Sequence, residues 1–245
     1  MRKCAFLTVL LVLLAAVPTI AGGELPKALR PGASAVFTRK ADGETLGGAV
    51  RFRVEEGEEG TVRLIREYDT GDVGPLTFRD RLTALLDVET RRVRSFVYEG
   101  AGGKADLLLL SRMGPDPERE GRFLHERFKY DAEGGRKRVR TRLKLDEAFV
   151  PDLLEPFLAG LTDIPAGEKR SFRLLTVTRG RLIKKPVDYR ALGEGKMELD
   201  DDIVVPCRIL NRTRSDESQL IYLRAADGMP LSFGPLRITV KEEPR

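Results

Sequence analysis

The sequence is poor in the side chains on which most catalytic and metal sites depend. It has no tryptophan, one histidine (His125) and two cysteines (Cys4 and Cys207) in 245 residues. Because Cys4 lies in the N-terminal apolar run, a Cys–His nucleophile pair could only be Cys207 with His125, and Cys207 lies in an alternating apolar segment typical of a buried strand. We find no phosphate-binding glycine loop, paired zinc-type cysteines or serine nucleophile elbow. The sequence predicts no catalytic residue, metal site or cofactor, and we expect a protein that is not an enzyme.

The densest acidic group, Glu198 with residues 200–202, also lacks the pattern of a metal site. Consecutive residues of a strand point to opposite faces, and the glycine and terminal glutamate of a calcium loop are missing. We expect a solvated turn between two strands.

Long apolar runs are absent except at the N-terminus. Arg2 and Lys3 precede an apolar run from Cys4 to Ala16, and small residues follow up to Ala21. This order is typical of a secretory signal peptide, and the run is shorter than the roughly 20 residues of a membrane span. We predict a signal peptide at residues 1–21, no transmembrane segment in the mature chain, and a periplasmic or secreted protein. Loss of Cys4 would leave no intramolecular disulfide.

Neither sign of charge is in large excess. Removal of residues 1–21 deletes two basic residues and no acidic one, so the formal net charge falls from +5 to +3. A protein that binds nucleic acid usually carries a stronger and more clustered excess, so no nucleic acid partner is expected. The remaining 224 residues are enough for a single domain with its own core, and we assign residues 22–245 to one antiparallel β domain.

Alternation of apolar and polar residues dominates the chain after residue 33, with turn residues every eight to twelve positions. This pattern predicts a mainly β fold built from antiparallel strands. Gly47 and Gly48 fall inside one strand and indicate a bulge or a close backbone approach. The expected strands are 35–40, 45–54, 61–68, 77–88, 92–98, 105–111, 122–130, 136–145, 171–178, 182–191, 196–200, 203–210, 219–224 and 236–241.

One short helix is expected between Asp146 and Leu161. Its apolar residues fall on one side at helical spacing, and Asp146 could cap it. Pro151 and Pro156 limit it to one or two broken turns, because an interior proline removes a backbone hydrogen bond. The apolar side chains of this segment are Phe149, Leu153, Leu154, Phe157 and Leu158.

One predicted strand carries a continuous basic row, formed by Arg136, Arg138, Arg140 and Arg142. Aligned charges on a rigid strand sum their field, so the row could hold anionic lipid head groups or an acidic partner. Alternatively, the row is only the solvated face of a sheet, paired across the hairpin with Glu120, Glu126 or Asp131.

Three stretches resemble a family of exported bacterial proteins of unknown function, whose fold is similar to that of the lipoprotein-localisation carriers. Residues 37–48 look like the family's first hairpin with its glycine. Residues 149–160 and the following Ile164-Pro165-Ala166-Gly167-Glu168 look like its central short helix and the entry to the next strand. Residues 205–209 and 222–231 look like its closing strands. The family usually has a tryptophan near Tyr222, and this chain has none.

The resemblance implies a curved antiparallel sheet, a half-barrel, around a short helical plug. Such a concave face can hold an acyl chain, and Phe149, Leu153, Leu154, Phe157 and Leu158 would then form an apolar lid. The leading hypothesis is a non-enzymatic envelope protein that binds an amphiphile, such as a lipid or a lipoprotein acyl chain. The alternative is a structural or assembly module that binds an envelope protein through a sheet edge or the basic row.

Overall fold

The computed structural model describes residues 24–41, 44–70, 78–102, 107–130, 135–144, 149–158, 164–199, 203–215, 217–233 and 236–239. The predicted signal peptide, the acidic turn at 200–202 and Asp146 lie outside these residues. None of the helices in the described ranges has the length and apolar character needed to cross a membrane.

The protein is mainly β, as the alternation predicts. The first eight strands are β1 (Ser34–Ala41), β2 (Glu44–Glu56), β3 (Thr61–Asp69), β4 (Phe78–Asp87), β5 (Val93–Gly102), β6 (Leu107–Pro115), β7 (Phe123–Tyr130) and β8 (Arg136–Leu143). The others are β9 (Phe149–Pro151), β10 (Lys169–Thr176), β11 (Arg181–Leu182), β12 (Val187–Glu198), β13 (Val204–Arg214), β14 (Glu217–Arg224), β15 (Pro230–Phe233) and β16 (Leu236–Thr239). The helical turns are η1 (Lys27–Leu29), η2 (Asp152–Leu154) and α1 (Glu155–Leu158).

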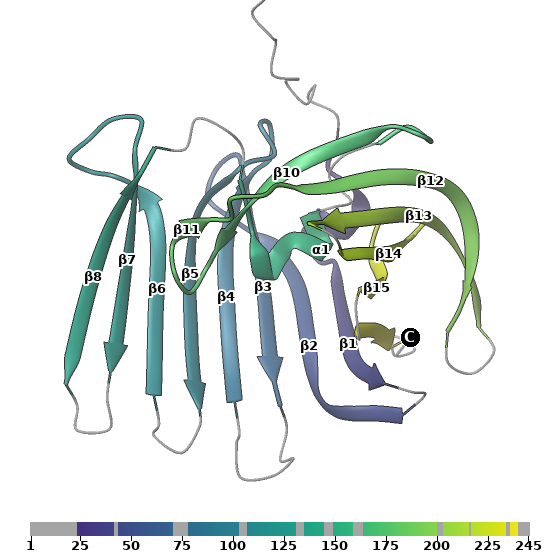
Figure 1. Cartoon of the computed structure of the whole chain (residues 1–245), viewed down its shortest axis with the longest axis horizontal. Helices are drawn as coiled ribbons and strands as arrows, with labels where there is room; N and C mark the ends of the chain where they lie inside the picture. The colour runs from purple at the N-terminus through teal and green to yellow at the C-terminus, as the bar shows by residue number, and fades with distance from the viewer. Residues whose placement is uncertain are drawn as a thin grey trace, which may run out of the picture.

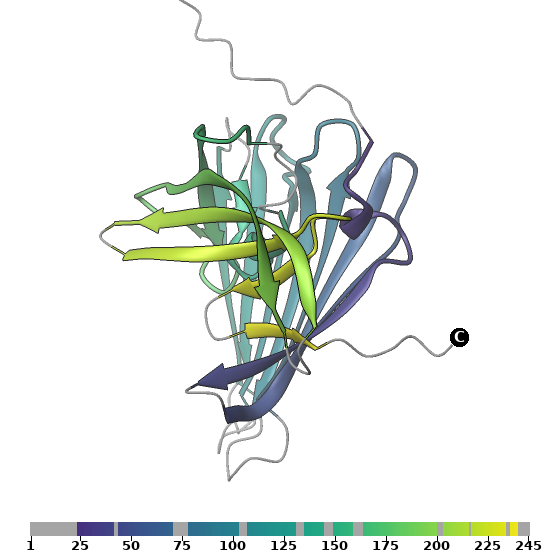
Figure 2. The same cartoon turned by 90° about the vertical axis from the view of Figure 1, so that its right-hand side faces the viewer.

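The strands form one continuous sheet in the order β11-β10-β12-β13-β14-β15-β16-β1-β2-β3-β4-β5-β6-β7-β8. Each pair along this path is antiparallel, and β9 adds to β10 in parallel. Strands β1 to β8 stand side by side as one broad layer (Figure 1). Strands β12 to β14 run across the inner face of that layer (Figure 2). The sheet therefore folds over on itself through β15 and β16, and β8 lies at one of its ends.

Strand register places the apolar residues of the first layer in rows on its inner face. One row consists of Val54, Leu64, Ala84, Phe96 and Met113, which are paired from β2 to β6 and are all buried. The next row holds Phe52, Arg66, Leu82, Tyr98 and Ser111. Side chains alternate across a strand, so each row requires the period of two seen in the sequence. The first row is wholly apolar, whereas the second row mixes apolar and polar side chains, so the inner face becomes more polar along the strands.

The predicted bulge at Gly47 and Gly48 is confirmed. Thr38 pairs with Ala49 while Arg39 pairs with Leu46, so the two glycines are extra residues in β2. Gly48 has a φ of 95°, and a Cβ there would lie 2.7 Å from the carbonyl oxygen of Asp69. Only glycine meets both demands without strain.

The predicted strands at 182–191 and 196–200 are wrong in detail. Residues 187–198 form the single strand β12. A register shift between Ala191 and Gly193 lets the pairing with β13 continue past the point where the apolar alternation is interrupted. Gly193 has a φ of 128°, and Leu192 at the irregularity is 53% exposed. The short strands β9 and β15 have no sequence prediction, and the predicted strand at 182–191 covers only Leu182 of β11.

The helical segment is shorter than its apolar stripe. Residues 149–151 are strand β9, residues 152–154 form the 3-10 turn η2, and α1 has four residues. Pro151 precedes the first turn and Pro156 lies at the second position of α1, as expected for helices limited by proline.

Candidate functional site

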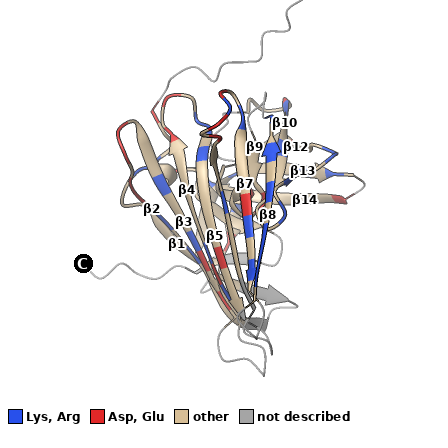
Figure 3. Cartoon of the chain, turned by 90° about the vertical axis from the view of Figure 1, so that its left-hand side faces the viewer, with Lys and Arg blue, Asp and Glu red and all other residues tan. Residues whose placement is uncertain are grey.

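The basic row lies on β8, the last strand in the sheet order of the described residues. Strand β8 pairs with β7 over all eight residues without a register shift, and among the described strands β7 is its neighbour in the ladder. Arginines alternate with Lys137, Val139, Thr141 and Leu143, and Figure 3 shows the Lys and Arg positions of β8 beside an acidic position on β7. The β8 edge therefore presents a backbone ladder and a row of cations together.

Glu126 on β7 is the main partner of this row. Arg140 donates from Nε to Glu126 Oε1 at 2.8 Å, and Arg138 donates from Nε to the same oxygen at 3.1 Å. Arg112 on β6 donates from Nε to Oε2 at 2.7 Å. Of the three acids considered from the sequence, Glu126 makes this pairing, and Asp131 lies outside the described residues.

The three arginines control the protonation of this carboxyl. Burial acts to raise the pKa of Glu126, but hydrogen bonds from Arg138, Arg140 and Arg112 lower it to about 2. The carboxylate is therefore charged throughout the ordinary pH range. It neutralises one of three guanidinium groups, each of which remains about half exposed.

The other two arginines of the row have different contacts. Arg142 donates from Nε to Asp116 Oδ2 at 2.8 Å and also pairs with Glu118. Arg136 lies over the ring of Phe128, with 4.2 Å between its guanidinium carbon and the ring centroid. The face thus brings together five arginines and three carboxylates, a local excess of two positive charges.

Phe128 and Arg112 are parts of this face that the sequence did not single out. Phe128 is 2% exposed although it lies on the outer side of β7, because Arg112, Arg136 and Arg138 cover its ring. A guanidinium over an aromatic ring is attracted by the ring quadrupole and keeps a planar stacking geometry. Stacking on Phe128 holds the three guanidinium groups in place and leaves their outer edges in solvent.

The opposite side of β8 has a different character. Val139, Thr141 and Leu143 are half-buried, whereas Lys137 is exposed. Register places Val139 beside Arg127 and Lys137 beside Lys129 on the inner face. The edge therefore has a cationic outer row and a more apolar inner row.

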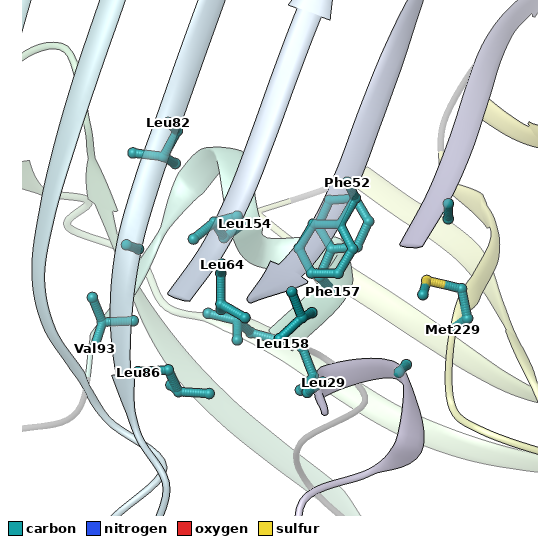
Figure 4. Packing of buried hydrophobic residues seen from close by; sticks show 14 of the residues in the cluster. Leu29, Phe52, Leu64, Leu82, Leu86, Val93, Leu154, Phe157, Leu158 and Met229 are labelled. Carbon is teal, nitrogen blue, oxygen red and sulfur yellow. The ribbon is translucent and has the colours of Figure 1, made fainter. Parts of the chain in front are cut away.

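The residues of the predicted apolar lid lie inside the fold. Phe149, Leu154, Phe157 and Leu158 are at most 5% exposed, and Leu153 is partly buried against the same core. Figure 4 shows Leu154, Phe157 and Leu158 among side chains from β2, β3 and β4. Each fully buried Phe or Leu contributes about 1.5–3 kcal/mol, so this segment fills the space between the layers as part of the core.

Little volume remains beside this plug. A cavity of about 10 Å³ lies between Glu155, Leu158, Phe172, Leu174 and Tyr189. That is barely enough space to hold one water molecule. An acyl chain would need the plug residues to move, or would have to bind elsewhere on the sheet.

A buried ion pair fixes α1 to the second layer. Arg212 on β13 donates from Nε to Glu155 Oε1 at 2.5 Å and from Nη2 to Oε2 at 3.0 Å. Tyr189 on β12 donates to Glu155 Oε1 at 2.6 Å. Burial raises the pKa of Tyr189 well above its ordinary value, with the Glu155 carboxylate acting in the same direction. These three groups satisfy one another, as buried polar groups must.

His125 and Cys207, the two residues considered for nucleophilic chemistry, are both buried. His125 is 1% exposed, and its Nε2 lies 2.7 Å from Ser111 Oγ. Ser111 donates its hydroxyl proton to the Val177 carbonyl at 2.6 Å, so the histidine ring is the donor toward Oγ. Burial lowers the pKa of His125 and raises that of the Cys207 thiol. The Ser111–His125 contact joins β6 to β7, and the hydrogen bond from Ser111 to Val177 joins β6 to the turn after β10.

Acidic and metal-ligating side chains do not converge elsewhere in the ranges that the structure describes. No group of three or more His, Cys, Asp or Glu residues there could hold a metal ion. A depression of about 330 Å³ on the outer face of β2 to β5 is lined mainly by charged residues, including Arg51, Glu67, Arg81 and Glu99. Arg81 and Glu67 pair across it at 3.7 Å.

Comparison with known proteins gives one likeness. No protein-family model matches the sequence, and no curated protein matches it. The chain is similar to the crystal structure of a beta-barrel-like protein of the domain of unknown function DUF1849 from Brucella abortus, with a TM-score of 0.40 and 9% identity. The match covers 85% of this chain and 98% of that chain. A likeness at this level assigns neither a family nor a function, and the similarity to lipoprotein-localisation carriers stays a prediction.

Proposed function

We propose that the protein is an exported, non-enzymatic module of the cell envelope that holds an acidic segment of a protein partner on β8. The observation that carries this proposal is the position of the basic row on a strand at the end of the sheet. Residues 136–144 contain six cationic side chains and no acidic one. The proposal depends on export, which follows from the predicted signal peptide.

The charge balance favours an acidic ligand over a neutral one. Glu126, Asp116 and Glu118 offset three of the five arginines, which leaves an excess on the outer face. Because Arg140 and Arg112 are half exposed, a second carboxylate can reach them without displacing Glu126. Guanidinium groups bind carboxylates with two parallel hydrogen bonds, which gives geometry as well as attraction.

The arrangement also supplies rigidity. The arginines are carried by a regular strand and are held by Phe128 and Glu126, so little side-chain freedom is lost when a partner binds. Each immobilised long side chain otherwise costs about 0.5–1.5 kcal/mol. A preorganised cationic row is therefore a better binding surface than flexible surface lysines.

A cross-linking experiment tests this function. The mature chain is incubated with periplasmic extract of the source cell and treated with a carbodiimide, which joins lysine amines to carboxylates in direct contact. We expect cross-linked peptides that connect Lys144, which follows β8 on the side of the arginines, or Lys137 at the same edge, to Asp or Glu of a partner. Cross-links distributed evenly over the exposed lysines of the protein would contradict the proposal.

A matched pair of variants tests the role of charge. The variant R136Q/R138Q/R140Q/E126Q removes three positive charges and one negative charge, so no carboxylate is left buried without a cation. The control K184Q/K185Q also lowers the net charge by two, at exposed residues between β11 and β12. We expect partner cross-linking to be lost in the first variant and kept in the control, with both variants folded at the assay temperature by circular dichroism.

A second candidate is the binding of an amphiphile on the inner face. Beyond the plug, register places half-buried Leu109 opposite exposed Lys129, and Lys129 opposite exposed Lys137. Apolar and cationic side chains in one row would suit an acyl chain with an anionic head group. Native mass spectrometry of protein purified without detergent tests it: a bound mass of a phospholipid or lipopeptide supports it, and a clean protein mass contradicts it.

A further inference from the structure

The ladder of β8 ends at its outer edge. All eight residues pair with β7 in one unbroken register, and within the described part of the chain the sheet order stops at β8. An edge strand of this length presents a row of backbone N–H and C=O groups on which another strand can pair.

The positive charge of β8 disfavours pairing of this strand with β8 of a second copy of the chain. If two copies of the chain paired through β8, cations would lie opposite cations along the whole interface. Like charges directly opposite each other destabilise strand pairing. The edge is therefore protected from self-association and open to a strand of opposite charge.

The two sides of β8 specify a pattern for that strand. Arg138, Arg140 and Arg142 lie on the outer side, and the half-buried Val139 and Thr141 lie on the inner side. A strand added to the edge would place every second side chain beside the arginines and the others beside Val139 and Thr141, because strand side chains alternate.

We propose that the partner of β8 is recognised by strand addition, and that its segment alternates acidic residues with small or β-branched apolar residues. This inference rests on the proposed function and defines the chemistry of the partner. Main-chain hydrogen bonds would supply part of the affinity, and carboxylates opposite the arginines would set the register. The segment pairs over most of the eight residues of β8.

Synthetic peptides test the inference with the mature chain. The first is an eight-residue peptide that alternates Glu with Val and Thr, and the second has the same composition with its Glu residues in one block. We expect the alternating peptide to bind at least ten-fold more tightly in a fluorescence anisotropy titration. Equal affinity of the two peptides would overturn the pattern.

Backbone methylation separates strand addition from simple charge attraction. In an antiparallel ladder, alternate N–H groups of a strand point to a given neighbour. Two isomers of the alternating peptide, N-methylated on its odd or its even residues, therefore differ. We expect one isomer to lose binding at least ten-fold more than the other.

Each outcome has a distinct meaning. If both isomers bind like the parent peptide, strand addition is wrong, while capture of acidic segments by β8 still stands. If the peptides do not bind but the carbodiimide cross-links from the lysines of residues 136–144 persist, the inference is also overturned and the proposed function is not. A dimer joined through β8, seen by sedimentation and cross-linking, would overturn the inference by identifying a different occupant.

Discussion

The ring of Phe157 in α1 lies stacked on the ring of Phe52 in β2, with centroids 3.9 Å apart and planes 7° from parallel. Two residues earlier in the same short helix, Glu155 bonds to Arg212 in the second layer. Residues two apart in a helix point in nearly opposite directions. The four residues of α1 therefore join the two layers, with an aromatic contact on one side and an ion pair on the other.

Removal of the Phe157 ring should destabilise the protein strongly. Phe157→Ala leaves a cavity beside Phe52 and Phe37, and such changes cost about 3–5 kcal/mol. Leu153→Ala is the control, because Leu153 is only partly buried and should cost less. Urea unfolding of both variants measures the difference. Equal loss in the two variants would show that the stacked pair does not hold the layers together.

The ion pair in α1 should be as sensitive. Glu155→Gln leaves Arg212 buried without a countercharge, and breaking a buried pair in this way costs about 3–5 kcal/mol. Tyr189→Phe removes one hydrogen bond to the same carboxylate and should cost less, about 1.5–3 kcal/mol. Denaturant unfolding compares them. If Glu155→Gln were as mild as Tyr189→Phe, the charge of Glu155 would not be the important contact.

Gly180 should tolerate no side chain. Its φ is 61°, and a Cβ would lie 2.1 Å from Nδ1 of His125. Gly121 is a matched control, since its φ is 70° and no atom lies within 4 Å of the added Cβ. Backbone strain should cost each alanine variant about 1–2 kcal/mol, and the collision should add about 1–3 kcal/mol for Gly180→Ala. Similar thermal unfolding of the two variants would contradict the tight contact at His125.

Acid should lower the stability of the folded protein by protonating Glu126. Although burial acts to raise it, the pKa of Glu126 is about 2 in the folded protein, below the ordinary value of 4.5, because of its arginines. A folded pKa below the unfolded one gives stability that is fully present above about pH 4.5 and is lost as the pH falls toward 2. We expect wild-type stability to fall more between pH 6 and 3 than that of E126Q, as measured by urea midpoints. Parallel curves would contradict this role of Glu126.

The sequence contains enough information for most strands. Alternation places β3, β4 and β7 within one or two residues, because one face of each strand is buried and the other is solvated. Prolines 151 and 156 correctly limit the helix, and the paired glycines mark the bulge in β2. The arginines at alternate positions of β8 also led to three candidate acidic partners, of which Glu126 makes the pairing.

Contacts between distant segments could not be predicted in the same way. Glu155 and Arg212 are 57 residues apart, and Ser111 and Val177 are 66 apart, so no local period connects them. The sequence does give one sign of the first contact: Glu155 is a charged residue within an apolar helical segment, which indicates a partner of opposite charge. Strands β11 and β15 have two and four residues, which is too short for a clear alternation.

The most direct test of the account uses a photoreactive amino acid in living cells. It replaces exposed Lys137 on β8 in one strain and exposed Lys185 in a control strain. We predict that Lys137 gives a protein cross-link through an acidic, alternating segment, that the R136Q/R138Q/R140Q/E126Q background abolishes it, and that Lys185 gives none. Equal cross-linking at both positions, or a lipid as the only product at Lys137, would contradict the claim that β8 holds an acidic protein segment.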